Sequence, residues 1–348
     1  MSRMERIFVL YNSDYDEEAD ATDVISVEDS ARAIANALRQ AGYTIDLVGQ
    51  KGLEVLSILD HIRATKPDLV YNLCESMAGD SCHEPTFVGM LDLFGVPYTG
   101  TDLLGLASCL HKQRAKDILN GRGIPTPPHR FLADPRDLDD PSLDTLDFPW
   151  FLKLAHEDAS VGITEENVVH SGAALRARAR ALMAEFDQAV LAERFIAGRE
   201  LNVALLGNGD DLTILPLHEI DFSAMPADRP HIVSYAAKWE ETHVDYAGTK
   251  PVPLRNASPA FIANVERVAR QAWTAMGLRD YGRIDLRVDA DDVPWVIDVN
   301  PNPDISPDAG VARSAQVAGM SYSQMIARIA EVAYARIHRK RIAVLAAS

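Results

Sequence analysis

Arg283-Ile-Asp-Leu-Arg-Val-Asp-Ala-Asp-Asp-Val-Pro-Trp-Val-Ile-Asp-Val-Asn-Pro-Asn-Pro303 is the stretch that decides the fold. Its pattern predicts two strands joined by a tight acidic turn, which brings Asp285 and Asp298 onto neighbouring strands. Side chains two positions apart share a face, so Asn300 lies beside Asp298, and Arg283 lies beside Asp285. Oxygen ligands of this kind suit Mg²⁺, which takes one or two carboxylates and leaves its other positions to water and phosphate. The alternative is a surface hairpin whose acids are merely solvated.

The composition limits the classes of protein to consider. The chain has 348 residues and 47% hydrophobic content, enough for a large core and two or three domains. Its net charge of −17 argues against a partner that is nucleic acid or an anionic membrane. It has no apolar run of membrane-spanning length and no signal-peptide pattern. The three cysteines lack CxxC spacing, which predicts reduced thiols in a cytoplasmic protein.

Strand and helix patterns alternate in the first third of the chain. An acidic loop is expected over residues 12–23. Strands are expected over residues 6–10, 43–48 and 68–73, and helices over 27–41, 53–64 and 84–94. This alternation predicts an N-terminal α/β domain with a mainly parallel sheet, spanning residues 1–107.

The remainder of the chain is expected to form a central lobe (108–198) and a C-terminal lobe (199–348). The central lobe is predicted to contain a helix over 108–120, a surface loop over 134–147, a strand over 150–154, a helix over 173–186 and a strand over 189–195. The C-terminal lobe is predicted to contain a strand over 200–206, further strands, the hairpin and a last helix over 322–340.

Three segments carry residues that suit a nucleotide. Lys153 lies in an apolar strand, where a lone ammonium needs an anionic partner. The polar turn 156–162 has small residues and can fold its backbone N–H groups over a phosphate. The apolar strand 190–196 could pack on a planar heterocycle. P-loop, dinucleotide, zincin and nucleophile-elbow motifs are absent from the sequence.

Taken together, and in their order along the chain, these segments resemble the D-alanine–D-alanine ligase branch of the ATP-grasp superfamily. The resemblance covers about residues 67 to 330. The matching landmarks are residues 97–100, Lys112, and residues 123–127, 151–153, 160–162, 190–196, 283–285, 298–303 and 318–323. The resemblance implies a three-lobed ATP-grasp fold of the α/β (α+β) class. It also implies an ATP-dependent carboxylate–amine ligase that works through an acyl phosphate and releases ADP and phosphate.

The resemblance implies roles at the nucleotide. Lys112 and Lys153 would hold the phosphates of ATP, and Lys238 would reach the transferring γ-phosphate. Ser160 and Gly162 would belong to the loop that covers the phosphates. The other nucleotide contacts would come from Glu193, Arg194 and Ile196 at the adenine and from Glu200 at the ribose.

The resemblance also implies a metal site and a catalytic cation. Asp285, Asp298 and Asn300 would hold two Mg²⁺ ions, with Mn²⁺ as a possible substitute. Arg283 would stabilise the oxyanion that forms during acyl transfer. The protein's task in phosphoryl transfer is mainly to neutralise charge and to align the groups that react.

The amino-acid sites depart from the family pattern. Glu75 stands where these ligases carry His, Ala159 replaces a Ser of the phosphate loop, and Trp239 replaces its Tyr partner. Asp304 replaces the usual Gly, and Ala309 replaces the Ser that anchors the carboxylate of the second amino acid. These changes argue against D-alanyl-D-alanine as the product. The candidate substrate residues are Asp23, Glu75, Trp239, Asp304, Asp308 and Ala309.

The substrates are expected to be a small-molecule carboxylate and a small-molecule amine, the amine being cationic, uncharged or a larger amino compound. Asp304 and Asp308 add negative charge near the amine, which favours an acceptor without a free carboxylate unless these acids face solvent. One alternative is an authentic D-alanine–D-alanine ligase of cell-wall synthesis. Another is a non-catalytic ATP-binding regulatory homologue. A homodimer, common in this family, stays open.

Overall fold

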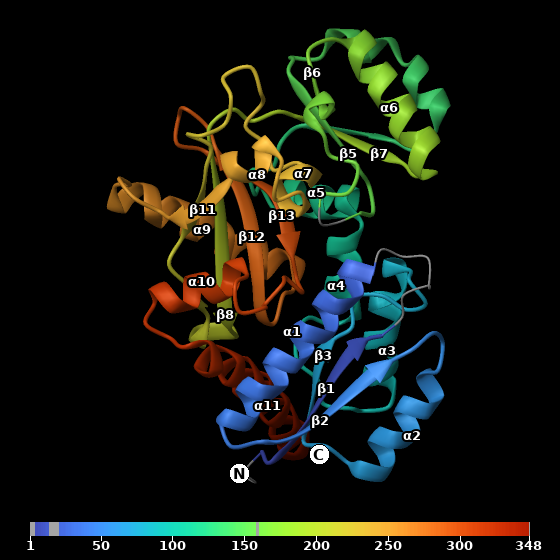
Figure 1. Cartoon of the computed structure of the whole chain (residues 1–348), viewed down its shortest axis with the longest axis vertical. Coiled ribbons are helices and arrows are strands. Elements are labelled where there is room, and N and C mark those ends of the chain that lie inside the picture. Colours follow the sequence, from blue (N-terminus) through green and yellow to red (C-terminus); the bar gives the residue numbers. More distant parts are fainter. Residues whose placement is uncertain (1–3, 14–20, 158–159, 348) are drawn as a thin grey trace.

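The computed structural model describes residues 4–13, 21–157 and 160–347, without the side chains of residues 21–26 and 340–347. Three β-sheets organise this part of the chain. In Figure 1 the N-terminal sheet lies at the bottom, a small sheet lies at the top, and the largest sheet lies between them. None of the described helices is both long enough and apolar enough to cross a membrane.

The N-terminal sheet is parallel, as predicted. Its order is β2-β1-β3, formed by β1 (Arg6–Asn12), β2 (Thr44–Gln50) and β3 (Leu69–Leu73). Successive side chains of β1 enter different cores, because a strand alternates its faces. Ile7 packs with α1 (Ala21–Gln40) and α11 (Tyr322–Ala347). Phe8 packs with α2 (Val55–Thr65) and α3 (Glu84–Leu93), which follows the short 3₁₀ helix η1 (Ser81–His83).

Two helices are longer than predicted. α1 begins at Ala21, so the end of the segment expected to be an acidic loop is helical. Residues 14–20 of that segment lie outside the described residues. Asp23 falls in the described backbone of α1, but its side chain is outside the described residues. α11 continues past its predicted end at residue 340 to Ala347.

The prediction of one helix over residues 108–120 is wrong. The chain forms α4 (Leu103–Leu110) and α5 (Lys112–Gly121), separated by His111, whose backbone is extended (φ −84°, ψ 90°). At the break, the Lys112 N–H donates to the carbonyl of Ala155 at 3.2 Å. This bond to a distant segment of the chain competes with a continuous helix, and local periodicity contains no sign of it.

The central lobe is a small antiparallel sheet covered by a helix. Its order is β4-β7-β5-β6, formed by β4 (His129–Leu132), β5 (Trp150–Leu154), β6 (Val168–Val169) and β7 (Val190–Arg194). α6 (Gly172–Phe186) packs on one face. The expected surface loop 134–147 contains η2 (Pro135–Asp139) and η3 (Pro141–Thr145), which place Leu138 and Leu143 in the same core. η4 (Glu165–Asn167) precedes β6.

The C-terminal sheet is antiparallel. Its order is β11-β10-β8-β12-β13, with β9 paired to β8; the strands are β8 (Arg199–Gly207), β9 (Thr213–Ile214), β10 (His218–Asp221), β11 (Lys250–Pro253), β12 (Asp280–Val288) and β13 (Pro294–Asn300). The helices of this lobe that were not predicted are α7 (Tyr235–Trp239), α8 (Val244–Gly248), α9 (Pro259–Met276) and α10 (Gly310–Val317), together with η5 (Gly209–Asp211).

α9 buries one face against β8, β12 and β13. Its boundaries follow ordinary capping chemistry. The Ser258 side chain accepts a hydrogen bond from the Phe261 N–H, Pro259 occupies the first turn, and Gly277 ends the helix at φ 69°. These signals were present in the sequence, so α9 was predictable.

Asp280 joins the N-terminal and C-terminal parts of the molecule. It is fully buried at the start of β12. Its carboxylate accepts hydrogen bonds from the Gly100 N–H at 2.9 Å, from Asn208 Nδ2 at 2.7 Å and from Arg336 Nη2 at 2.8 Å. Because Arg336 belongs to α11, this contact holds the last helix against both parts.

Candidate active site

The hairpin of β12 and β13 has the predicted register. Asp285 lies opposite Asp298, and Arg283 lies opposite Asn300, with a bulge just after Asp285. The side chains of these residues therefore share one face of the sheet. The prediction that carboxylates, an amide and a guanidinium converge in this hairpin is confirmed.

Asp285 is the centre of this polar group. Its two oxygens accept bonds from Arg283 Nε at 2.7 Å and Arg283 Nη2 at 2.8 Å. Asn300 Nδ2 donates to Oδ2 at 3.0 Å, and Asn202 Nδ2 donates to Oδ1 at 2.7 Å. Burial alone would lower the pKa of the Arg283 guanidinium, but Asp285 and Asp298 raise it above its usual value. The sequence analysis missed Asn202, which β8 places next to Asp285.

Asp298 lies between the hairpin and a group of lysines. Burial raises the pKa of its carboxyl, but the ammonium groups of Lys112, Lys153 and Lys116 lower it more, so the net shift is downward. Asp298 is therefore ionised at neutral pH. No cluster of three or more His, Cys, Asp and Glu side chains forms a metal site within the described residues. A metal here would need Asn300 or substrate oxygens in addition to the two aspartates.

Glu193 is the anionic partner that the buried Lys153 was expected to need. Its Oε1 lies 2.6 Å from Lys153 Nζ, and its Oε2 lies 2.9 Å from Lys116 Nζ. The two ammonium groups also donate to backbone carbonyls of β13, Lys153 to Ile297 at 3.0 Å and Lys116 to Val296 at 3.1 Å. This buried group of Lys116, Lys153 and Glu193, here called the lysine–glutamate cluster, joins the central lobe to the hairpin.

Charge in the lysine–glutamate cluster is finely balanced. Burial lowers the pKa of Lys116 to about 8, although Glu193 raises it in part. Burial raises the pKa of the Glu193 carboxyl, but the ammonium groups of Lys116 and Lys153 lower it by more than burial raises it. Glu193 therefore stays ionised. The sequence analysis missed Lys116. Its spacing of four residues from Lys112, which puts both on one face of α5, was the available signal.

The described residues of the segment expected to cover phosphates bond to two lobes. Lys112 Nζ donates to the Glu157 carbonyl at its beginning. Ser160 Oγ donates to the Val233 carbonyl at 3.0 Å, and the Tyr235 N–H donates to the Ile163 carbonyl at 2.9 Å. Ala159 lies outside the described residues. These bonds connect the segment to the start of α7, which carries Lys238 and Trp239, both exposed.

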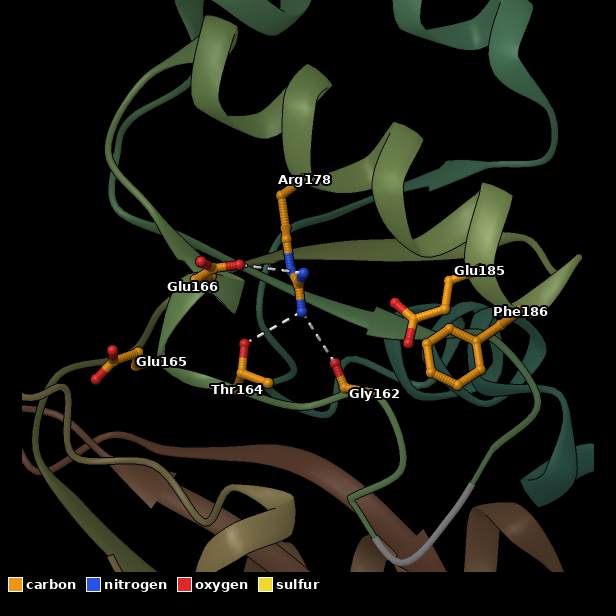
Figure 2. Close-up of a pocket in the computed structure, with 7 residues that line it drawn as sticks. All are labelled: Gly162, Thr164, Glu165, Glu166, Arg178, Glu185 and Phe186. Atoms are coloured by element: carbon orange, nitrogen blue, oxygen red, sulfur yellow. Dashed lines mark hydrogen bonds and ion pairs between the residues drawn. The ribbon is translucent and has the colours of Figure 1, made fainter. Parts of the chain in front are cut away.

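Figure 2 shows how the end of this segment is held. Arg178 extends from α6, and its Nη2 donates to Thr164 Oγ1 at 3.1 Å and to the Gly162 carbonyl at 3.4 Å. The same guanidinium bonds to the buried Asn167 at 2.7 Å and pairs with Glu166 at 3.3 Å. The cavity beside it, of about 330 Å³, lies near Gly162 and is not lined by the predicted metal ligands. Arg178 therefore holds the end of this segment from the side of α6.

The predicted adenine and ribose residues lie on β7, on the connection that follows it and at the start of β8. Ile196 is buried, whereas Arg194 is exposed and lies 3.3 Å from Asp147. Glu200 is buried, with Arg287 Nη1 3.1 Å from its Oε2. Burial raises the pKa of the Glu200 carboxyl, with Arg287 opposing the rise. Arg287 was missed by the sequence analysis.

The candidate substrate residues are more scattered. Asp304, Asp308 and Ala309 share the loop before α10, where Ser306 Oγ lies 3.0 Å from Asp304 Oδ2 and 3.3 Å from Asp308 Oδ1. Both acids are exposed, and Ala309 is buried. Glu75 is exposed on the N-terminal part of the molecule, after β3.

Comparison with known proteins agrees with this geometry. The family model for the C-terminus of D-ala D-ala ligase matches residues 118–331. The D-alanine–D-alanine ligase of Bordetella petrii is 31% identical over 89% of this chain and 88% of its own length. The chain belongs to the D-alanine–D-alanine ligase family. It is therefore an ATP-grasp protein and an ADP-forming carboxylate–amine ligase.

The chain is also similar to other proteins, at lower or similar identity. An uncharacterised protein of Sinorhizobium fredii, y4sG, is 31% identical over 88% of both chains. The D-alanine–D-alanine ligase of Bacillus anthracis complexed with ATP superposes with a TM-score of 0.72 and 21% identity, covering 97% of this chain and 99% of that one. The VanG D-Ala:D-Ser ligase of Enterococcus faecalis gives 0.72 and 18%, over 95% and 100%. These two structures support the fold alone.

The lysine–glutamate cluster predicts a coupled loss of stability. Lys116→Met should lower the free energy of unfolding by about 3 kcal/mol, because a buried charge loses a partner. Glu193→Leu should also be costly, since it leaves two ammonium groups together. The double variant should lose at least about 1 kcal/mol less than the sum of the single variants. Urea denaturation measures all three.

Lys51→Met is the matched control for the lysine–glutamate cluster, because Lys51 is exposed. It should change the free energy of unfolding by no more than about 0.5 kcal/mol. Strictly additive losses in the double variant would mean that the three side chains do not act as a group.

A histidine pair beside Lys112 predicts a pH effect on stability. His111 Nδ1 and His156 Nδ1 lie 3.1 Å apart. Burial is the main cause that lowers the pKa of both imidazoles from the ordinary 6.5. Below pH 6.5 the unfolded chain therefore binds more protons than the folded one, so stability should fall as the pH decreases through this window.

The variant His111→Asn/His156→Gln should show a flatter decline of the free energy of unfolding between pH 7 and pH 5.5 (roughly the window below an ordinary histidine pKa). Urea denaturation across this range is the measurement. His170→Gln, at an exposed site, should decline like the wild type. Equal slopes for the pair variant and the wild type would contradict the expectation.

Proposed function

We propose that this site transfers the γ-phosphoryl group of ATP to a substrate carboxylate and then joins the acyl group to an amine. The observation that carries the proposal is the position of the hairpin. Asp285 and Asp298 lie on it beside Arg283, and the lysine–glutamate cluster is bonded to its backbone. Negative groups that could hold metal and positive groups that could hold phosphate therefore lie together.

The nucleotide would lie between the central lobe and the hairpin. Lys112 and Lys153 would bind phosphates, and Lys238 would approach the γ-phosphate when the lobes close. The Glu193 side chain is already bonded to two lysines, so its contribution to adenine binding would come from its backbone. Arg194 and Ile196 would complete the adenine site, with Glu200, held by Arg287, at the ribose.

Asp285, Asp298 and Asn300 fit Mg²⁺ by the chemistry of their donors. They offer two carboxylates and an amide oxygen, which are hard ligands on one face of the sheet. We propose two Mg²⁺ ions, replaceable by Mn²⁺. Bound metal would neutralise the triphosphate and polarise the transferring phosphoryl group.

The chemistry would proceed in two balanced steps. A carboxylate oxygen attacks the γ-phosphorus, the bond to the β–γ bridging oxygen breaks, and ADP leaves. The amine nitrogen then attacks the acyl carbon, the C–O bond to phosphate breaks, and phosphate and a proton are released. Arg283 would stabilise the oxyanion of the second step. The segment with Ser160 and Gly162 would exclude the water that otherwise hydrolyses the acyl phosphate.

We propose that the product is not D-alanyl-D-alanine. Support comes from the residues that differ from the family pattern at the amino-acid sites, Glu75, Ala159, Trp239, Asp304 and Ala309. The nucleotide and metal positions keep the pattern, which favours a working ligase over a regulatory protein that has lost turnover. The remaining alternative is a D-alanine–D-alanine ligase with a shifted pocket.

ADP release from ATP tests the proposed function. The wild type with Mg²⁺ should release ADP with at least one pair in a matrix of small carboxylates and amines, and far less with D-alanine alone. Asp298→Asn should lose activity by roughly 100-fold or more, because transition-state charge is left unbalanced. Its urea midpoint should stay within the range of the wild type. Full activity in excess EDTA would exclude the metal site, and efficient D-alanine dimerisation would restore the cell-wall assignment.

We propose a cytoplasmic enzyme of three lobes, 1–107, 108–198 and 199–348. Support comes from Cys74, Cys82 and Cys109, which are free thiols of the kind that a reducing compartment maintains. The first boundary falls inside α4, so the break at His111 is the better place for a hinge between lobes.

We also propose a homodimer formed through the N-terminal lobe. Leu56 on α2, Leu93 on α3 and Leu104 on α4 are 72–79% exposed. Exposed apolar groups on neighbouring helices are typical of an interface. Leu93→Asp/Leu104→Asp should convert a dimer into a monomer in analytical ultracentrifugation at micromolar concentration. Val317→Asp, an exposed apolar site on α10, is the control that should leave the dimer intact. A monomeric wild type would contradict the proposal.

A further inference from the structure

Arg287 lies on the active-site face of the C-terminal sheet. Side chains two positions apart along a strand point to the same side, so Arg287 shares its face with Arg283 and Asp285. Directly opposite Arg287 on β8 is Glu200, and Asn202 lies opposite Asp285. The row of polar side chains around the proposed metal ligands therefore continues along both strands to Arg287 and Glu200.

The Arg287 guanidinium connects three segments that border the proposed nucleotide site. Its Nη1 donates to Glu200 Oε2 at 3.1 Å and to the His231 carbonyl at 2.7 Å. Its Nη2 donates to the Gly198 carbonyl at 3.3 Å, and its Cζ lies 4.7 Å from the centre of the Phe195 ring. Phe195 and Gly198 belong to the connection between β7 and β8, and His231 precedes α7. A side chain held by all of these groups has little freedom to move.

Stability alone does not explain this buried ion pair. The side chains of Arg287 and Glu200 are 6% and 11% exposed. Replacing a buried ion pair with apolar residues of similar size is often neutral or stabilising, because both charges must be taken out of water. In addition, Arg287 Nε is shielded from solvent and has no hydrogen-bond partner within the described residues, which costs about 1–3 kcal/mol. A fold that keeps such a pair therefore calls for an explanation in function.

The pair leaves one oxygen of Glu200 available to a ligand. Arg287 holds Oε2, whereas Oε1 accepts no hydrogen bond from the residues that the structure describes. Burial raises the pKa of the Glu200 carboxyl and Asp285 adds to the rise, while Arg287, Lys238 and Arg283 oppose it. Arg287 thus orients the carboxylate and also favours its charged form, which is the stronger hydrogen-bond acceptor.

We propose that Arg287 is a positioning residue that gives this chain a preference for ribonucleotides over deoxyribonucleotides. It holds Oε2 of Glu200 so that Oε1 accepts hydrogen bonds from the sugar hydroxyls. The proposal rests on the proposed function, in which Glu200 lies at the ribose. A nucleotide that lacks these hydroxyls leaves a charged acceptor desolvated and unpaired, and a site of this kind discriminates strongly against such an analogue.

Sugar analogues test the proposal. ATP is compared with 2′-deoxy-ATP and 2′,3′-dideoxy-ATP, which keep the base and the phosphates but lose one or both hydroxyls. Binding to the full chain, with Mg²⁺ and without a carboxylate or amine substrate, is measured by isothermal titration calorimetry. The wild type should bind ATP roughly 10- to 100-fold more tightly than the dideoxy analogue, the usual contribution of hydrogen bonds to a charged group. Arg287→Met should reduce this ratio to roughly 3-fold or less, mainly by weakening ATP.

Further variants separate positioning from a structural role. In a Glu200→Gln background, Arg287→Met should have no further effect on the ratio, because Arg287 acts through that carboxylate. Arg199→Met is the matched control, since Arg199 bonds to Glu219 at 2.7 Å on the opposite face of β8, and it should leave the ratio unchanged. A cooperative urea transition shows that a variant is folded. If Arg287→Met does not fold, Arg287→Lys takes its place and should keep only part of the ratio, because it retains the charge but not the planar fork.

The outcomes separate this inference from the proposed function. If the analogues bind as tightly as ATP, if the Arg287 variant keeps the wild-type ratio, or if its effect adds to that of Glu200→Gln, the inference is overturned. ADP release with a carboxylate and an amine would leave the ligase function standing in each of these cases. If the ratio depends on Arg287 but no pair of substrates yields ADP, the inference stands and the proposed function fails. A chain that binds no ATP would overturn both.

Discussion

One buried carboxylate, that of Glu193, holds the two halves of the active site together. It pairs with Lys153 from β5 and Lys116 from α5, and both lysines also bond to carbonyls of β13. The next residue along β13 after Ile297 is Asp298, so a shift in the cluster would move a proposed metal ligand directly. A buried ionic group tolerates little displacement, because each charge left unpaired costs several kcal/mol. The central lobe and the hairpin are therefore held in register by electrostatics as well as by packing.

The same cluster prepares the site for a highly charged ligand. Positive charge from Lys112, Lys116 and Lys153 keeps Asp298 ionised despite its burial. On the neighbouring strand β12, Arg283 and Asp285 form an ion pair in which each neutralises the other's charge. The protein thus places both signs of charge in fixed positions before the nucleotide arrives. Preorganisation of this kind reduces the reorganisation that phosphoryl transfer would otherwise require.

Features that depend on neighbouring residues were predictable from the sequence, and features that depend on distant contacts were not. The alternation in the hairpin predicted the pairing of Asp285 with Asp298. The break between α4 and α5 was missed because it depends on a bond from Lys112 to Ala155. Lys116 was missed because its partner Glu193 lies 77 residues away. α9 is the exception, since its caps were visible in the sequence and were overlooked.

The two ends of the active site differ in burial, and this difference explains why the family was easier to recognise than the substrate. Lys153, Glu193 and Asp285 are buried and bonded to other side chains of the site, so a change in one disturbs several others. Asp304 and Trp239 are exposed on a loop and a short helix, where substitutions cost little stability. A family can therefore keep its phosphoryl-transfer chemistry while the acceptor side changes freely. Specificity then depends on local geometry, because the fold alone does not determine it.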